Sequence, residues 1–200
     1  MADTRRYESG PDATIRATEE ALTRARRARS VILVEGISDQ IALETIADLR
    51  GRDLEAERIV VVPIGGAHAV HNLIRALGDT ADIRLSGLVD DAEVDLFTAA
   101  AASSPAFAAV RIHVCVRDLE DELIRAIEPA EFEALLDAEG DLGAFRTMQK
   151  QPGWRDRPFE SQMHRWLRSI SGRTNRYADR VLRSPGARLP APLVAAIDEA

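Results

Sequence analysis

Hydrophobic residues follow two patterns along the first two-thirds of the chain. Short continuous runs rich in Val and Ile alternate with longer segments in which apolar residues return every three or four positions. The first pattern is typical of strands buried on both faces, and the second of amphipathic helices. Strands are expected at residues 31–34, 59–64, 83–90 and 110–116, with helices at residues 12–29, 38–50, 65–78 and 93–102. The alternation predicts an α/β fold in which helices flank a parallel four-stranded sheet in a Rossmann-like arrangement.

The strand pattern ends near residue 118. Six shorter segments with helical periodicity follow, and Pro or Gly residues separate them. The separators are Pro129, Gly140, Pro152, Gly172, Pro185 and Pro190. We therefore expect an N-terminal helix at residues 1–28, an α/β domain at residues 29–128 and an all-helical C-terminal extension at residues 129–200.

Charge is unevenly distributed between these parts. The whole chain has a net charge of -7, but residues 145–188 contain eleven Arg and Lys against three Asp and Glu, a local net charge of +8. Residues 1–144 hold fifteen basic and twenty-eight acidic residues, a net charge of -13. An acidic body with a basic extension is the asymmetry that a function has to explain.

Composition excludes several classes of protein. No apolar run approaches the ~18–20 residues of a membrane span, and the N-terminus lacks the apolar run of a signal peptide, so a cytoplasmic location is expected. The single cysteine, Cys115, excludes an internal disulfide framework and a cysteine-based zinc site. Its apolar neighbours indicate a packing role for the thiol.

Acidic residues follow three of the four expected strands. They are Glu35 and Asp39 after the first strand, Asp90, Asp91 and Glu93 after the third, and Asp118 and Glu120 after the fourth. Ligands of open parallel sheets bind where strands deliver their C-terminal ends, so neighbouring strands would bring these carboxylates into one crevice. Like charges at short range raise one another's pKa, and a cation makes such a cluster tolerable. Oxygen ligands without accompanying Cys or His favour Mg²⁺ or Mn²⁺ over zinc.

A structural role is the alternative for several of these acids. Asp39, Glu93 and Asp118 stand where the first turn of a helix is expected, and a lone acid there often caps the helix or interacts with its dipole. Glu35 is harder to explain as a cap, because Ser, Thr, Asp or Asn would be usual at such a position. Two further acids fit a solvated helix face: Asp121 and Glu122.

The segment VILVEGISDQIAL (31–43), with GLVDDAE (87–93) two strands later, resembles the TOPRIM domain. This is the catalytic module shared by topoisomerases, bacterial primases and OLD-family (overcoming lysogenization defect) nucleases. The form VEGxSDxxAL is closest to the OLD family, and CVRDLEDELIRAI (115–127) resembles the LExEL-type segment of that group. The resemblance covers roughly residues 29–128 and implies a TOPRIM-like sheet there.

In that family the strand-end glutamate and the DxD acids bind divalent metal and act in phosphoryl chemistry, and OLD-like members use two metals to cleave nucleic acid. By resemblance Glu35 matches the invariant glutamate, Asp39 the second acid of the first motif, Asp90 the first aspartate of DxD, and Glu120 the glutamate of the later motif. The resemblance thus implies a Mg²⁺- or Mn²⁺-dependent nuclease with two metal sites and with DNA favoured over RNA. Its catalytic residues would be Glu35, Asp90 and Glu120, and its further metal ligands Asp39, Asp91, Glu93 and Asp118.

The chain departs from the family at Ala92, where the second aspartate of DxD would stand. Asp91 and Glu93 flank this position and are the candidates to supply the missing ligand. The alternative is a catalytically impaired module that binds nucleic acid or protein and has an incomplete metal site. No GxxxxGK[ST] sequence occurs, which excludes ATP hydrolysis by that motif within the chain. We expect a stand-alone module or one that borrows an ATPase from a separate partner, and an oligomer is compatible with both.

Arginines recur at intervals of three to five in the basic extension. They are Arg165, Arg168, Arg173, Arg176 and Arg180. We predict that they neutralise the phosphates of nucleic acid beside the metal site. Trp154, Trp166 and Tyr177 are interleaved with them, and although aromatic rings can stack on unpaired bases, their apolar neighbours indicate mainly core packing.

Two weaker signals follow the second strand. Gly65 and Gly66 would let backbone N–H groups approach a phosphate at a helix N-terminus, and a tight turn explains them equally well. His68 and His71 share one face of the expected helix, but such pairs are more often surface or packing residues than metal ligands.

Overall fold

The structure, a computed structural model, describes residues 13–65, 73, 83–102, 110–170 and 172–200. The described part is centred on a sheet of four parallel strands in the order β2-β1-β3-β4. The strands are β1 (Ser30–Val34), β2 (Ile59–Pro63), β3 (Arg84–Asp90) and β4 (Arg111–Cys115). The predicted parallel four-stranded sheet is therefore confirmed.

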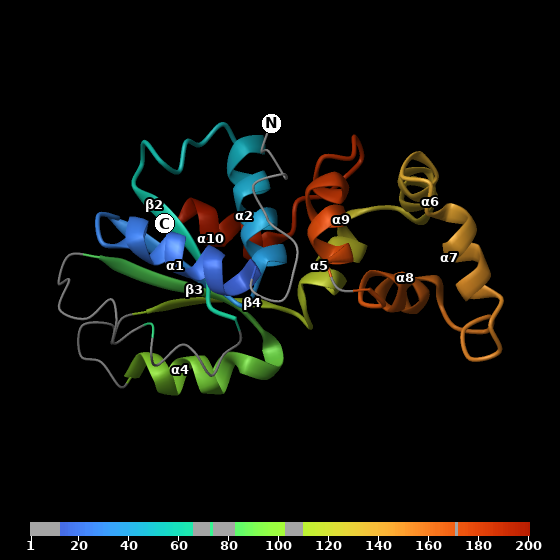
Figure 1. Cartoon of the computed structure of the whole chain (residues 1–200), viewed down its shortest axis with the longest axis horizontal. Coiled ribbons are helices and arrows are strands. Elements are labelled where there is room, and N and C mark those ends of the chain that lie inside the picture. Colours follow the sequence, from blue (N-terminus) through green and yellow to red (C-terminus); the bar gives the residue numbers. More distant parts are fainter. Residues whose placement is uncertain (1–12, 66–72, 74–82, 103–109, 171) are drawn as a thin grey trace.

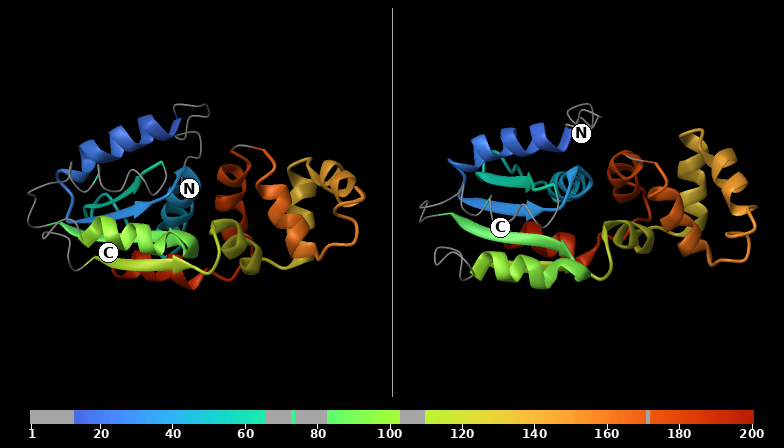
Figure 2. Two further views of the ribbon diagram at one scale, coloured as in Figure 1. Left: turned by 90° about the horizontal axis from the view of Figure 1, so that it is seen from below. Right: turned by 60° about the horizontal axis from the view of Figure 1, so that its bottom comes forward.

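Helices cover both faces of this sheet (Figures 1 and 2). Two helices, α2 and α10, pack against one face, and two others, α1 and α4, pack against the opposite face. Their bounds are α1 (Ala13–Ala25), α2 (Ile37–Leu49), α4 (Val94–Ala102) and α10 (Ala191–Asp198). The expected helix at residues 65–78 lies almost entirely outside the described residues, and Gly66, His68 and His71 lie outside them as well.

The two hydrophobic layers explain why the strands are continuous apolar runs. Side chains alternate between the faces of a strand, so Ile32 and Val34 enter the layer beneath α2 while Val31 and Leu33 enter the layer beneath α1. Every residue of β1 is buried. A strand that is covered on both sides has no solvent-facing position, and the sequence shows no polar alternation there for that reason. Cys115 is also buried in the first layer, as its expected packing role requires.

Beyond β4 every element of the described chain is a helix, which confirms the predicted all-helical extension (Figure 1). The helices before α10 are α5 (Leu119–Ala126), α6 (Pro129–Ala138), α7 (Leu142–Gln149), α8 (Phe159–Leu167) and α9 (Arg173–Leu182). Their core is aromatic, with the Phe145 ring centroid 5.5 Å from that of Trp166 and 5.9 Å from that of Phe132. None of the described helices is both long and apolar enough to cross a bilayer.

The extension lies at the C-terminal ends of the strands (Figure 2), and polar contacts from α2 to α9 and Arg183 hold it there. The Thr45 hydroxyl donates to Asp179 at 3.1 Å, and Arg183 joins Asp179 at 2.7 Å to Asp48 at 2.6 Å. One hydrophobic cluster continues from the sheet into the extension, from Ile32 to Trp166. The extension is thereby held against the sheet edge where the acidic residues lie, while its boundary at residue 128 stays a prediction.

Gly87 in β3 leaves the space that Phe97 of α4 needs to pack against the sheet. A Cβ atom added to Gly87 would lie 2.4 Å from the nearest ring atom of Phe97, whose side chain is fully buried. We expect Gly87→Ala to lower the free energy of unfolding by about 1–3 kcal/mol, because the ring has to leave its packed position. Urea denaturation measures the change. The control is Gly143→Ala in α7, where an added Cβ meets nothing within 4 Å, so an unchanged or higher stability is expected there.

Candidate metal centre and nucleic-acid interface

The strand order creates a crevice at the ends of β1 and β3. The chain leaves β1 to form β2 on one side of it and later returns to form β3 on the other side, so these two strand ends flank a topological switch point. Open parallel sheets bind ligands at such points. Glu35 follows β1 directly, Asp90 is the last residue of β3, and β4 leads into Glu120. Three neighbouring strand ends therefore deliver carboxylates to one edge of the sheet.

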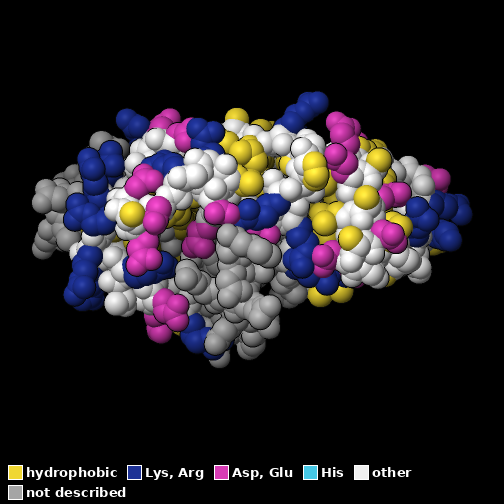
Figure 3. Space-filling view, turned by 90° about the horizontal axis from the view of Figure 1, so that it is seen from above, with side chains coloured by type: hydrophobic (Ala, Val, Ile, Leu, Met, Phe, Trp, Pro, Cys, Tyr) yellow, Lys and Arg dark blue, Asp and Glu magenta, His cyan; other side chains and the backbone are white. Residues whose placement is uncertain are grey.

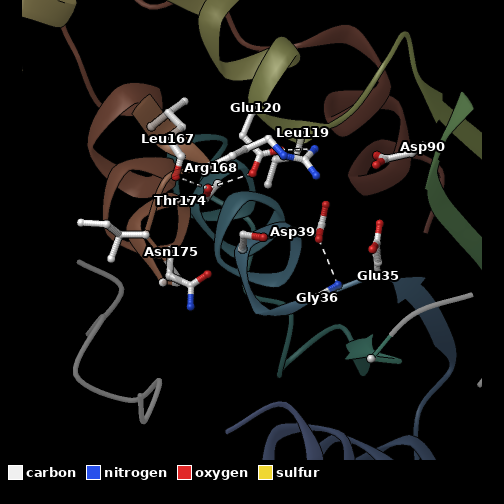
Figure 4. Close-up of a pocket in the computed structure, with 14 residues that line it drawn as sticks. Glu35, Gly36, Asp39, Asp90, Leu119, Glu120, Leu167, Arg168, Thr174 and Asn175 are labelled. Carbon is white, nitrogen blue, oxygen red and sulfur yellow. Dashed lines mark hydrogen bonds and ion pairs between the residues drawn. The ribbon is translucent and has the colours of Figure 1, made fainter. Parts of the chain in front are cut away.

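A cavity of about 460 Å³ opens at this edge (Figure 4). Its lining includes Glu35, Asp39, Asp90, Glu120, Arg168 and Thr174. The first three belong to the sheet and the start of α2, whereas Arg168 and Thr174 come from the C-terminal extension. The cavity thus lies between the two parts of the chain, with acids mainly on the sheet side.

Asp39 caps α2 and also faces the cavity. One carboxylate oxygen accepts a hydrogen bond from the backbone N–H of Gly36 at 3.0 Å. Burial raises the pKa of Asp39 to about 7, against the lowering effect of this hydrogen bond, and the charge of Glu35 raises it further. The capping role considered from the sequence is real, and it leaves the second oxygen of Asp39 available to a ligand.

Glu35 and Asp90 are the two acids at the strand ends themselves. The pKa of Asp90 is raised to about 8, mainly by burial and further by the charges of Asp39 and Glu35. Burial also raises the pKa of Glu35, with Glu93 and Glu120 adding to the effect. These shifts arise because three carboxylates of one sign share a partly desolvated space, where a divalent cation would offset their repulsion.

Asp118 is committed to protein contacts. One of its oxygens accepts from the backbone N–H of Asp121 at 2.9 Å, which makes it the N-cap of α5. The other oxygen lies 2.7 Å from His164 Nε2 and 3.0 Å from Arg168 Nη1. Only 8% of its side chain is exposed. Three contacts already engage the two oxygens of Asp118, which disfavours its predicted role as a metal ligand.

Glu120 faces the cavity from the start of α5. Its Oε1 accepts a hydrogen bond from the Thr174 hydroxyl at 2.9 Å, and its Oε2 lies 3.9 Å from Arg168 Nη1. Arg168 therefore places a guanidinium group between Asp118 and Glu120. Figure 4 shows this group beside Glu120, across the cavity from Glu35 and Asp90. The side chain of Arg168 is 54% exposed, so it keeps donors for a ligand in the cavity.

The other acids divide into cavity residues and structural residues. Asp91 is exposed and lines neither of the two cavities at this edge of the sheet, whereas Glu93 lines the one beside Glu35 and raises the pKa of that group. The expectation that Glu122 belongs to a solvated face is wrong. Only 4% of Glu122 is exposed. Its carboxylate accepts a hydrogen bond from the Val116 N–H at 2.9 Å and pairs with Arg125 at 2.6 Å.

The donor set at the edge of the sheet suits a hydrated hard cation. Within the described ranges, no group of three Asp, Glu, His or Cys side chains is arranged to hold a metal ion by itself. Mg²⁺ does not need such a group, because it retains several waters and commonly uses one or two carboxylates. Glu35 and Asp90, with the second oxygen of Asp39, supply only oxygen donors, and burial together with their mutual repulsion raises their pKa values. These residues fit a divalent cation held partly through water.

The arginines expected to bind nucleic acid have different environments. The structure does not support Arg173 as a residue that binds nucleic acid, because only 8% of it is exposed. Its guanidinium carbon lies 3.7 Å from the Trp166 ring centroid, and it donates to the Trp166 carbonyl at 2.8 Å. Arg176 and Arg180 pair with acids of the extension. Acidic and basic side chains are interspersed on the face shown in Figure 3. Of the five predicted residues, Arg165 and Arg168 line a cavity that also contains Glu35 and Asp90.

Comparisons with known proteins agree with this architecture. Residues 28–91 match the family described as overcoming lysogenization defect protein-like, TOPRIM domain. The chain contains an OLD-like TOPRIM domain. The matched range includes Glu35, Asp39 and Asp90, and it ends before Asp118 and Glu120.

Solved structures share the fold of the TOPRIM domain together with its helical extension. The C-terminal region of the Burkholderia pseudomallei OLD protein aligns with a TM-score of 0.60 at 17% identity, covering 86% of this chain and 96% of that one. The C-terminal region of the Xanthomonas campestris pv. campestris OLD protein aligns with a TM-score of 0.56 at 19% identity, covering 86% and 91%. No curated protein matches the chain.

The raised pKa values of the TOPRIM acids predict how pH affects stability. Asp39 and Asp90 ionise in the folded protein at pKa values of about 7 and about 8, far above the ~4 of an unfolded aspartate. Between about pH 4 and pH 8 the folded protein therefore binds more protons than the unfolded chain. The contribution of both groups to stability is full below about pH 4 and is lost as the pH rises through 7 and 8. We expect the Tm of the metal-free protein to fall between about pH 6 and pH 8.5 through these groups.

Mn²⁺ should oppose this fall, because cation binding requires ionised carboxylates. Thermal scans with EDTA or Mn²⁺ should show a larger Mn²⁺-induced rise in Tm at about pH 8.5 than at about pH 6. Asp39→Asn with Asp90→Asn removes both groups and should flatten the pH dependence. An equal Mn²⁺ effect at both pH values would contradict the assignment of these acids.

Proposed function

We propose that the chain is a divalent-metal-dependent nuclease of the OLD-like TOPRIM type that cleaves nucleic-acid phosphodiesters. The observation that carries the proposal is the cavity in which Glu35, Asp39 and Asp90 lie opposite Arg168. Such a site offers a cation position on one side and a guanidinium fork on the other. A phosphodiester needs both, because its oxygens carry negative charge that grows as cleavage proceeds.

The cation is proposed to be Mg²⁺ or Mn²⁺, held by Glu35 and Asp90 with help from Asp39. When bound there, it supplies Lewis acidity, which polarises a phosphate oxygen and lowers the pKa of water. The sequence resemblance implies two metals, but His164 and Arg168 engage Asp118, and Arg168 stands beside Glu120. We therefore propose one cation per chain, with the Arg168 guanidinium meeting the phosphate on the other side.

The remaining roles follow from the contacts. Arg168 donates N–H groups to non-bridging phosphate oxygens, and its contact with Asp118 keeps the fork in place. Glu120 is held through Oε1 by the Thr174 hydroxyl, so its Oε2, 3.9 Å from Arg168 Nη1, is the oxygen that accepts a proton from the attacking water. Gly36 donates to Asp39 and thereby sets the orientation of that carboxylate.

A direct assay tests the proposal. Labelled single- and double-stranded DNA and RNA are incubated with the protein in Mg²⁺, Mn²⁺ or EDTA, and the products are resolved by size. Cleavage that requires the cation supports the nuclease. Absence of cleavage with all four substrates in both cations would contradict it.

A binding module is the second candidate, and Ala92 favours it. This residue lines the crevice beside Glu93 at the position where the family carries an aspartate, so one ligand of the usual set is absent. If the chain is such a binding module, nucleic acid should bind equally well in EDTA and in Mn²⁺, and it should remain intact in Mn²⁺. A separate ATPase partner, a homo-oligomer and a cytoplasmic location stay predictions from the sequence.

A further inference from the structure

A second cavity of about 820 Å³ adjoins the metal centre. It shares Glu35, Asp90 and Arg168 with the first cavity and extends along α8 to the segment that precedes this helix. A ligand whose phosphate reached the metal centre would therefore continue into this space. Its volume falls within the range of about 300–1,000 Å³ that is typical of ligand pockets, and this space suits a short length of single-stranded nucleic acid.

The walls of this second cavity carry opposite charges. Glu35, Asp90 and Glu93 lie on the side of the sheet. The opposite wall, formed by α8 and the segment before it, carries Arg157, Arg165 and Arg168. Arg117 lines the same cavity from the link between β4 and α5, next to Asp118. An acidic wall suits the cation, and a basic wall suits the phosphates on either side of the scissile bond. The separation of the two charges across one cavity is what a polyanion bridging both walls requires.

Two arginines of this cavity, Arg117 and Arg157, are less neutralised than Arg176 and Arg180 of α9. Arg157 is exposed, and its side chain makes no hydrogen bond or ion pair with any residue that the structure describes. Arg117 lies 3.8 Å from Asp118, which His164 and Arg168 already engage at shorter distances. Arg176 and Arg180, by comparison, each have an acidic partner within the extension. Arg157 therefore keeps its positive charge available to a ligand in the cavity that adjoins the metal centre.

Trp154 adds an aromatic surface to the same wall. Its carbonyl accepts from Gln162 at 2.8 Å and its N–H donates to the Gln151 carbonyl at 2.8 Å, so the turn that carries the ring is fixed. The ring is partly buried against the core, and the guanidinium carbon of Arg165 lies 5.9 Å from its centroid. A tryptophan ring and a guanidinium plane both stack on bases, and only an unpaired base presents a free face to them.

We propose that this second cavity binds single-stranded nucleic acid, with phosphates on Arg117, Arg157 and Arg165 and an unpaired base stacked on the Trp154–Arg165 surface. The inference deepens the proposed function, on which it rests for the route of the strand to the metal centre. Binding itself needs no cation, because the groups of this wall are all side chains of the protein. The substrate class is thereby a single strand or an unpaired end rather than an intact duplex.

Fluorescence anisotropy in EDTA tests the inference without cleavage. The probe is a labelled DNA strand of about 12 nucleotides, used alone and annealed to its complement. We expect tighter binding of the single strand, a roughly 5- to 100-fold loss with Trp154→Ala, and a smaller loss with Trp154→Phe. Arg157→Ala should weaken binding and reduce the slope of log K against log salt by about 0.7, the value for one phosphate contact.

Arg155→Ala is the matched control. Arg155 lies two residues before Arg157, is 64% exposed and pairs with Asp156 at 3.2 Å, but it does not line the cavity. Its variant should bind the strand as the wild type does. Wild-type affinity in both Trp154→Ala and Arg157→Ala, tighter binding of the duplex, or no binding of the strand at all would each overturn the inference. Because EDTA removes catalysis, these outcomes are separate from a failure to cleave.

Discussion

Glu35→Gln is expected to abolish metal-dependent cleavage of nucleic acid while the fold persists. The side chain stands directly after β1 at the switch point, and its charge contributes to the raised pKa values of Asp39 and Asp90. Replacing the carboxylate by an amide removes the anionic ligand but keeps the shape. A cation contributes several kcal/mol to the transition state, so its loss should lower kcat by roughly 10²- to 10⁴-fold. Initial rates at saturating Mn²⁺ measure the effect.

The stability of Glu35→Gln separates this reading from a structural one. Burial and like charges disfavour ionised Glu35, so the amide should leave the metal-free Tm unchanged or raise it. Glu55→Gln, an exposed position at the other end of the sheet, is the control and should retain wild-type rates. Retained cleavage in Glu35→Gln would remove this residue from the mechanism, and a collapsed Tm would show that its role is structural.

Arg168→Ala should have the second largest effect. The guanidinium lies opposite Glu35 and Asp90, where it can donate to the phosphate, and removing one such donor costs roughly 10²- to 10³-fold in kcat. Arg168 also lowers the pKa of Glu35 through its charge. Without it, Glu35 retains its proton to higher pH, so the rising limb of the pH–rate profile should move to higher pH. A merely structural arginine would not shift that limb.

Two further variants complete this test. Arg168→Lys retains the charge but loses the fork, so it should recover part of the rate and most of the pH profile. Arg146→Ala removes an arginine of similar exposure, 56%, that pairs with Glu133 away from the cavity, and it should be neutral. If Arg168→Ala cleaves at the wild-type rate with an unshifted profile, the proposed role of the guanidinium is wrong and a second cation becomes the better explanation.

The sheet and the acids at its edge could be predicted because their signals are local. A strand covered on both faces has to be a continuous apolar run, and an acid directly after such a run has to lie at the sheet edge. Glu35 and Asp90 could therefore be placed beside each other once the strands were taken as parallel neighbours. The strand order itself came from the structure, since no local pattern distinguishes the possible orders.

The environments of Asp118 and Arg173 could not be predicted from the sequence, because their partners are distant or in other helices. Asp118 is engaged by His164 and Arg168, which follow it by 46 and 50 residues. Arg173 begins α9 after Gly172, whose φ of +78° turns the chain so that the guanidinium lies on Trp166. Periodic spacing shows that arginines share a helix face, but it does not show which face meets the core.

Two arginines of the second cavity, Arg117 and Arg157, were missed because they lie outside the helices. Arg157 lies between Pro152 and Pro158, outside any helical repeat, and Arg117 lies in the link between β4 and α5. Neither belongs to the periodic set that drew attention to the extension. The signal that was present is the grouping of Trp154 with two nearby arginines in a short segment between prolines, which is a composition suited to a binding loop.

Calorimetric titration of Mn²⁺ at about pH 8 tests the central claim most directly, namely that Glu35 and Asp90 hold one catalytic cation. Wild-type protein should bind one Mn²⁺ per chain, Glu35→Gln and Asp90→Asn should lose this binding, and Asp118→Asn should retain it. The account is contradicted if the wild type takes up no Mn²⁺, if Glu35→Gln binds as well as the wild type, or if only Asp118→Asn loses the ion.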